Sequence, residues 1–126
     1  KGHADFTLVF RCLSQTLRGD SDAVRQLFDE PSAFDAWAQR WQKRLEQDGV
    51  AAEANAQAMD RVNPIYIPRN HKVEEALAAA TNHQDIKPFK NLLEVLSHPF
   101  YEVEGKEAYA EPAPETNIPY RTFCGT

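Results

Sequence analysis

Few cysteines, no clustered glycines and no long hydrophobic segment are found in this sequence, and each absence excludes a class of protein. The two cysteines, Cys12 and Cys124, are too few for a disulfide framework or a metal site. The five glycines are scattered, so no glycine-rich loop can cradle a phosphate group. No apolar run approaches the roughly 20 residues of a transmembrane helix, and we recognise no signal peptide.

Basic charge and paired histidines are also lacking. The 14 Lys and Arg residues are outnumbered by 19 Asp and Glu residues, which gives a net charge of -5. A nucleic-acid partner is therefore not expected, because no basic stripe could displace the counterions of phosphates. The four histidines do not have the short spacing of zinc ligands, so surface or helix-capping positions are the better interpretation. From the residue pattern alone we predict no catalytic, cofactor-binding or metal site.

Helical periodicity is present along most of the chain. Apolar residues recur at the spacing of one helix face, and glycines or prolines follow the expected helix ends at Gly19, Gly49, Pro64 and Pro99. We therefore predict an all-α fold of about five or six helices with an extended, proline-rich C-terminal arm. The expected helices run from Phe6 to Leu17, around Val24, from Ser32 to Leu45, from Val50 to Arg61, from Lys72 to Thr81, and from Asp85 to just before Pro99.

Two local patterns give sharper structural predictions. Ser32 followed by Asp35 forms a capping box, which predicts that a helix begins after Ser32. Trp37 and Trp41 share the apolar stripe of that helix with Phe34, so we expect both indole rings to lie in the core.

Domain organisation follows from where the periodicity stops. We expect a helical domain over residues 1–98 and an extended tail over residues 99–126 that ends Cys-Gly-Thr. Cys124 lies on this tail, where its thiol could reach a partner surface for redox chemistry or as a latch. An unreactive end-of-chain cysteine is the alternative. A disulfide with Cys12 is a further alternative, which a reducing compartment disfavours.

A short block between two expected helices is the other candidate site. Asn63-Pro64 stops one helix, Ile65–Pro68 must be extended, and Asn70 is expected to cap the next helix. Two arginines, Arg61 and Arg69, flank the extended part. Either the block is a structural joint whose arginines pair with nearby acids, or it is an edge for docking another domain. The docking residues would be Arg61, Asn63, Arg69 and Asn70.

Residues 61–80 resemble the signature of the selenoprotein O family, also called YdiU. Residues 97–101 and 120–126 match in the same order, as do residues 5–11, so the resemblance covers nearly the whole chain. Members of this family are protein-kinase-like enzymes that transfer AMP from ATP to Ser, Thr or Tyr hydroxyls of proteins. They use a metal ion and bind the nucleotide inverted relative to ordinary kinases.

The resemblance implies that this chain is roughly the last quarter of such a pseudokinase. ATP and Mg or Mn would then be bound upstream, with no catalytic, cofactor-binding or metal residue in this chain. The expected partners are the upstream kinase-like domain of the same polypeptide and the protein substrates, with no nucleic acid and no membrane. In animal members a selenocysteine occupies the place matching Cys124, which makes a role in redox regulation the expectation.

The sequence also suggests a cellular location and an alternative function. A reducing, cytoplasmic location in a bacterium fits the low cysteine content. The alternative function is a free-standing helical interaction module that binds a protein through the face of Trp37 and Trp41 or through the tail.

Overall fold

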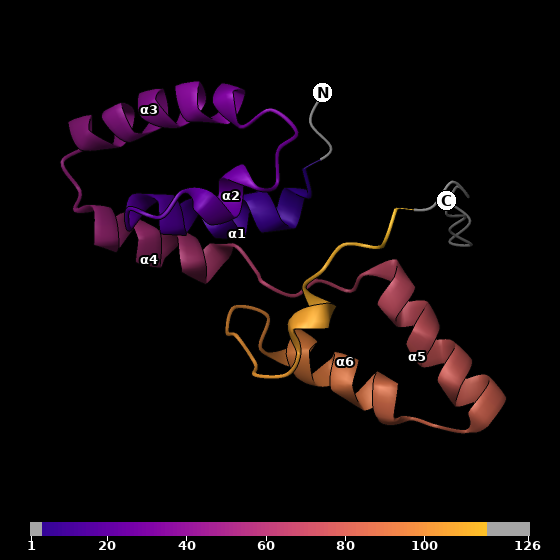
Figure 1. Cartoon of the computed structure of the whole chain (residues 1–126). Helices are drawn as coiled ribbons and strands as arrows, with labels where there is room; N and C mark the ends of the chain where they lie inside the picture. Colours follow the sequence, from indigo (N-terminus) through magenta and orange to yellow (C-terminus); the bar gives the residue numbers. More distant parts are fainter. Residues whose placement is uncertain (1–3, 116–126) are drawn as a thin grey trace, which may run out of the picture.

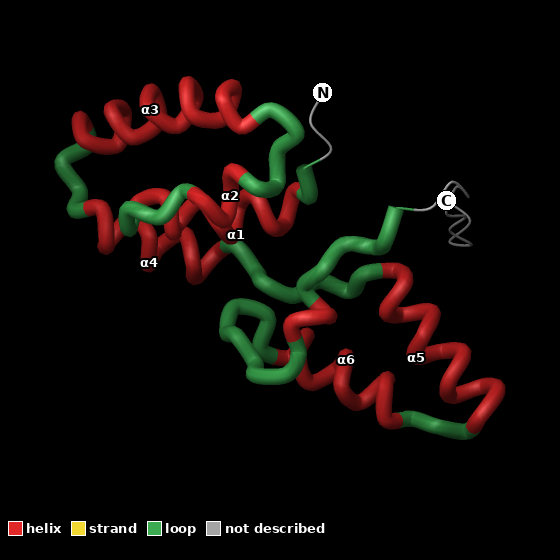
Figure 2. Tube along the Cα trace, in the orientation of Figure 1, coloured by secondary structure: helices red, strands yellow, loops and turns green. Residues whose placement is uncertain are grey.

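A computed structural model describes residues 4–115, and the regular elements among these residues are all helices, with no strand (Figures 1 and 2). The predicted all-α fold is therefore confirmed for this part of the chain. None of the helices described is long and apolar enough to cross a membrane. The elements are α1 (Phe6–Leu17), α2 (Asp22–Arg25), α3 (Pro31–Gln47), α4 (Ala52–Val62), α5 (Asn70–His83), α6 (Lys87–Ser97) and the 3-10 helix η1 (Glu107–Tyr109).

The ends of α1 and α3 confirm the glycine signals. Gly19 follows α1 with a φ of +94°, and Gly49 follows α3 with a φ of +71°. Side chains with a Cβ rarely adopt this left-handed backbone, so glycine is the residue that can end a helix there at little cost.

The capping prediction for α3 is wrong. The helix begins at Pro31, and its N-cap residue, Glu30, makes no side-chain capping bond. Proline suits the first helical position because the amide hydrogen that it lacks would have no partner inside the helix. Asp35, the expected capping acid, instead forms an ion pair with Arg25 at 3.1 Å. Asn70 is likewise the first residue of α5 and not its cap, which is Arg69.

The first four helices form one group around an apolar cluster. In Figure 1, α1 and α4 lie side by side and α3 lies across the group from α4, with α2 between α1 and α3. Buried apolar side chains from α1, α2 and α3 form the centre of this cluster. Its buried members are Leu13, Val24, Phe34 and Ala38, and Val9, Cys12, Phe28, Trp41 and Met59 pack against them.

The remaining residues form a second group. Helix α6 packs against α5, and the chain after α6 folds back toward them (Figure 2). The aromatic ring of Tyr66 is buried in this group, and its hydroxyl accepts a hydrogen bond of 3.0 Å from the Val103 amide. The first part of the expected tail thus packs on helices, and the boundary at residue 98 stays a prediction. Ile65, Tyr66, Leu92 and Val95 are buried, with Val73, Leu96, Val103, Tyr109 and Ala110 against them.

The predicted burial of the tryptophans is wrong for Trp37, whose side chain is 40% exposed. Trp41 is half-buried, and its ring stacks on that of Trp37 with centroids 5.3 Å apart. Helices α1 and α4 pack closely against each other. The backbone of α3 comes close to that of α2, but it does not approach α1 or α4 as closely. Only part of its apolar stripe is therefore covered. Apolar residues of the other helices are exposed as well: Phe6, Phe10, Val62, Leu77, Phe89 and Leu93.

Candidate inter-domain joint

The segment between α4 and α5 connects the two groups of helices. Pro64 and Pro68 keep it out of the helical conformation, because each proline disfavours an α conformation in the residue before it. The amides of Ile65 and Tyr66 donate to the carbonyl oxygen of Pro99, at 2.7 and 3.3 Å. The segment is thereby fixed against the chain that follows α6.

Arg69, at the end of this segment, forms a two-pronged ion pair with Asp5. Its two terminal nitrogens lie 2.8 and 2.9 Å from the two carboxylate oxygens of Asp5. The Arg69 side chain is only 8% exposed and that of Asp5 is 20% exposed. The residues are 64 positions apart, so the pair joins the start of α1 to the start of α5. Paired bonds of this kind fix both distance and orientation.

Asp5 has a second function at the same place. Its carboxylate accepts a hydrogen bond of 2.9 Å from the Leu8 amide and so caps α1. The hydrogen bonds from Arg69 lower the pKa of Asp5 below its usual value, and this effect outweighs the rise that burial alone would cause. The carboxylate is therefore held in its charged form, which is the form that both bonds need.

Arg11 binds the other end of the segment. One of its terminal nitrogens donates to the carbonyl oxygens of Asp60 and Asn63, at 2.8 and 3.1 Å. These carbonyls belong to the last turn of α4 and its C-cap, where no further helical amide is available to them. A cation placed there also interacts favourably with the negative end of the helix dipole.

An ion-pair network extends from this point along α1 and α4. Arg18 contacts Glu53 at 3.0 Å and Asp60 at 2.9 Å, and Asp60 also lies 3.7 Å from Arg11. Burial by itself would raise the pKa of Asp60, but the nearby Ser14 hydroxyl and the two guanidinium groups lower it overall. Glu53 and Asp60 are thus each paired with an arginine.

The predicted docking residues have different surroundings. Arg69 is buried in the ion pair, and the main-chain oxygen of Asn63 is bound by Arg11. Arg61 and Asn70 are exposed. Asn63 and Arg69 both take part in the joint, through Arg11 and Asp5 respectively. The docking role proposed for the four residues stays a prediction.

Cys124 lies outside the described residues. The other cysteine, Cys12, is half-buried against the first apolar cluster, and burial raises the pKa of its thiol. Since the thiolate is the reactive form, Cys12 is a poor nucleophile near neutral pH.

Sequence reasoning missed three residues of the joint: Asp5, Arg11 and Tyr66. For Asp5 a signal existed, because an aspartate just before the first residue of an apolar helical stripe is typical of an N-cap. Its partner Arg69 could not be identified in this way, since no local pattern relates residues so far apart.

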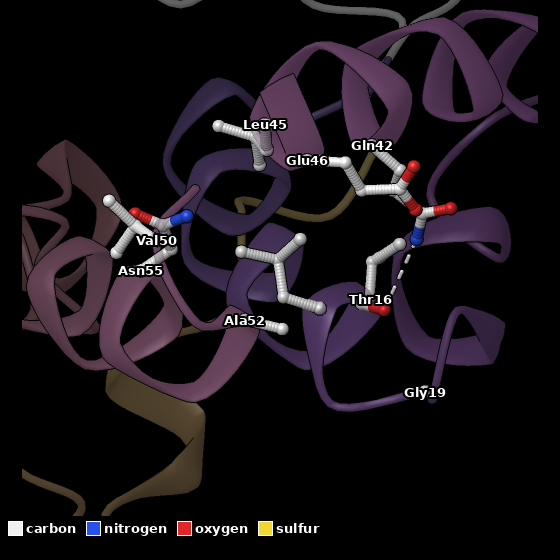
Figure 3. A pocket seen from close by; sticks show the side chains of 9 residues that line it. Thr16, Gly19, Gln42, Leu45, Glu46, Val50, Ala52 and Asn55 are labelled. Carbon is white, nitrogen blue, oxygen red and sulfur yellow. Dashed lines mark hydrogen bonds between the residues drawn. The ribbon is translucent and has the colours of Figure 1, made fainter. Parts of the chain in front are cut away.

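A cavity of about 340 Å³ lies where α1 and α3 end and α4 begins. Figure 3 shows Gln42 pointing toward Thr16. The side-chain amide of Gln42 donates a hydrogen bond of 3.5 Å to the carbonyl oxygen of Thr16. The lining has one carboxylate, Glu46, and no basic side chain, so it does not suit a phosphate group. Within residues 4–115 there is also no group of three or more His, Cys, Asp or Glu side chains that could hold a metal ion.

Comparison with known proteins gives a consistent result. The family model described as protein adenylyltransferase SelO matches residues 2–97. The protein nucleotidyltransferase YdiU of Mycobacterium sp. (strain KMS) is 52% identical over 124 residues, which cover 98% of this chain and 24% of that protein. The YdiU protein of Rhodopseudomonas palustris (strain HaA2) is 49% identical over 128 residues, covering 100% and 26%. This chain thus spans about a quarter of the length of these relatives.

Proposed function

This chain belongs to the protein adenylyltransferase SelO family, and from that premise we propose that it is the C-terminal helical region of a longer protein nucleotidyltransferase. The complete polypeptide would transfer AMP from ATP to Ser, Thr or Tyr hydroxyls of proteins, with release of pyrophosphate. Its location would be the bacterial cytoplasm.

The observation that carries this proposal is the extent of the similarity. About half of the aligned residues are identical to those of relatives named protein nucleotidyltransferase, and the match covers 98 to 100% of this chain. Similarity of this length involves the joint and both groups of helices, and not one motif alone.

The described residues do not fit the Mg²⁺ or Mn²⁺ ion that accompanies ATP, because no group of three or more His, Cys, Asp or Glu side chains among them could hold a metal ion. Magnesium and manganese prefer carboxylate oxygens, but Asp5, Glu53 and Asp60 are each engaged by an arginine. We therefore assign nucleotide and metal binding to the upstream part of the polypeptide, and derive no catalytic step from the residues of this chain.

The contribution of this chain would be mechanical support. The Asp5–Arg69 pair and the Arg11 contacts fix the start of α1 to the segment between α4 and α5. A kinase-like body attached before α1 would in this way be held in one orientation relative to α5 and α6.

The activity is tested with the full-length protein. Incubation with Mg²⁺ or Mn²⁺ and ATP labelled at the α-phosphate should label proteins, whereas ATP labelled at the γ-phosphate should not. The 126-residue chain alone is the control and should neither bind ATP tightly nor label anything. Transfer of the γ-label, or of no label under any condition, would show that the enzyme is not an adenylyltransferase.

We further propose that Cys124 regulates the activity. Its thiol would form a disulfide with the thiol of a cysteine upstream of Lys1. A two-electron oxidant such as hydrogen peroxide would accept the two electrons and two protons and be reduced to water, and a thiol reductant would reverse the step. Oxidation should then lower AMP transfer by the full-length protein, and reductant should restore it. A Cys124→Ser variant should lose this response, with Cys12→Ser as the matched control. An unchanged response in Cys124→Ser would eliminate Cys124 as the switch.

The alternative of a free-standing interaction module is favoured by one observation, the exposed Trp37. Tryptophan is enriched where proteins bind each other. The coding sequence upstream of Lys1 separates the two functions: a kinase-like region supports the enzyme, and a start codon at this point supports the module.

A further inference from the structure

An apolar groove lies between α3 and the α1–α4 pair, next to the joint, with Asn63 in its lining. It has a volume of about 520 Å³ and is lined mainly by apolar side chains. Its rim includes Phe10, Trp37 and Val62, which are 41%, 40% and 71% exposed. We call the five residues Phe10, Trp37, Trp41, Met59 and Val62 the aromatic groove.

We propose that the aromatic groove is filled by an amphipathic helix from the part of the polypeptide that precedes Lys1. This inference rests on the proposed function, in which the chain is the last quarter of a longer protein. Exposed apolar surface of this extent, concentrated in one concave site, is typical of a surface that another element covers.

The position of α1 supports this occupant. Phe6 is 76% exposed, and its ring lies 4.7 Å from that of Phe10 on the groove rim. Phe6 is the first residue of α1, so the incoming chain reaches the molecule beside the groove. About three quarters of the length of the relatives lies outside this chain, which leaves ample polypeptide to supply a covering element.

Tethering favours this occupant over a second copy of the chain. A connected segment has an effective concentration on the order of millimolar, far above the concentration of a separate molecule in a dilute solution. A twofold interface uses the same patch on both subunits. In a dimer formed through the aromatic groove, two concave surfaces would therefore face each other, and neither could fill the other.

A helix is the form that the occupant should take. The groove is bounded by α1, α3 and α4, and no strand edge is present among residues 4–115 to pair with an extended segment. Backbone amides and carbonyls buried in the groove must therefore be satisfied within the incoming segment itself, as they are in a helix. Apolar anchors at helical spacing would then contact Trp37 and Met59.

Photocrosslinking of the full-length protein tests the proposal. Benzoylphenylalanine placed at Trp37, and in a second variant at Val62, should crosslink to residues upstream of Lys1 within the same molecule. The same group at Gln39, an exposed position of α3, is the matched control and should give several-fold less of that product. Mass spectrometry identifies the partner peptide, and a denaturing gel separates monomers from dimers.

Each other outcome overturns the proposal. Crosslinked dimers would identify a second copy as the occupant, and crosslinks confined to residues 1–126 would identify this chain itself. A yield at Trp37 and Val62 no higher than at Gln39 would show an open groove. AMP transfer is measured separately, on the protein without benzoylphenylalanine. If the crosslinks lead to upstream residues but the protein transfers no AMP, only the proposed activity is contradicted. If no upstream polypeptide is encoded, both proposals fail.

Discussion

Arg69 has the most demanding surroundings of any residue at the joint, because its guanidinium group is both charged and buried. Removing a charge from water costs several kcal/mol, and a partner of opposite charge must offset that cost. Asp5 supplies this partner and also caps α1, so one carboxylate serves two structural functions.

Replacing Asp5 by Ala should therefore destabilise the chain by about 3–5 kcal/mol, since Arg69 is left buried without its counter-charge. Urea denaturation measures the change in the free energy of unfolding. Asp29→Ala, at an exposed acid, is the control and should change it by less than about 0.5 kcal/mol. A loss below about 1 kcal/mol for Asp5→Ala would mean that water replaces the pair at little cost.

The lowered pKa of Asp5 also predicts a dependence on pH. A carboxyl group whose pKa is lower in the folded state contributes stability that is fully present above its unfolded value of 3.8. This contribution is lost as the pH falls below 3.8 and through the folded pKa. Denaturation series between neutral and strongly acidic pH should show a shallower acid decline for Asp5→Asn than for the parent. Identical slopes would exclude Asp5 as a contributor.

Helix α3 places its apolar side chains in two different environments. Phe34 is 5% exposed in the first apolar cluster, whereas Trp37, on the same helix, is 40% exposed. Helix α3 thus has one face in the core and another on the aromatic groove.

This difference predicts unequal effects of two substitutions in the 126-residue chain. Phe34→Ala should cost about 3–5 kcal/mol, as expected for an aromatic lost from a core. Trp37→Ala should cost about 1–2 kcal/mol, because much of its ring remains in water. Urea denaturation of both variants gives the comparison, and equal losses would indicate that the groove is closed in the chain alone.

On the scale of the whole molecule, the second group of helices depends on the chain that follows α6. Tyr66 is 3% exposed and connects the segment before α5 to Val103 through its hydroxyl. The early part of the C-terminal arm is therefore a packed element of this group.

Tyr66→Phe should release this contact and cost about 1–2 kcal/mol, because the Val103 amide loses its acceptor. Hydrogen exchange followed by NMR should show faster exchange at Val103. Tyr101→Phe is the control, since that side chain is 72% exposed. Unchanged exchange at Val103 would show that the hydroxyl does not hold the arm.

The helices could be predicted from sequence because their signals are local. Apolar periodicity and the glycines at positions 19 and 49 act within a few residues, and the structure confirms both. The exposure of Trp37 could not be predicted, since periodicity identifies an apolar stripe but not the element that covers it. The capping box at Ser32 does not form, because α3 starts at Pro31, two residues before the start that a Ser32 cap predicts.

The site was harder to predict than the fold. The block from Arg61 to Asn70 was recognised from its prolines and arginines, and Arg69 and Asn63 indeed take part in the joint. Its partners Asp5 and Arg11 belong to the N-terminal helix α1 and its cap, 64 and 52 positions earlier in the chain than Arg69 and Asn63. Only the folded structure brings them together.

The Asp5–Arg69 pair has a consequence for the order of folding. It closes a loop between residues 64 positions apart, and closing long loops costs entropy that only earlier contacts can offset. We therefore expect the packing of α1 on α4 to precede it, and the pair to form late in folding. A contact that forms late in folding lowers the rate of unfolding more than it raises the rate of folding. The Asp5–Arg69 pair would therefore act chiefly by lowering the rate at which the folded protein unfolds.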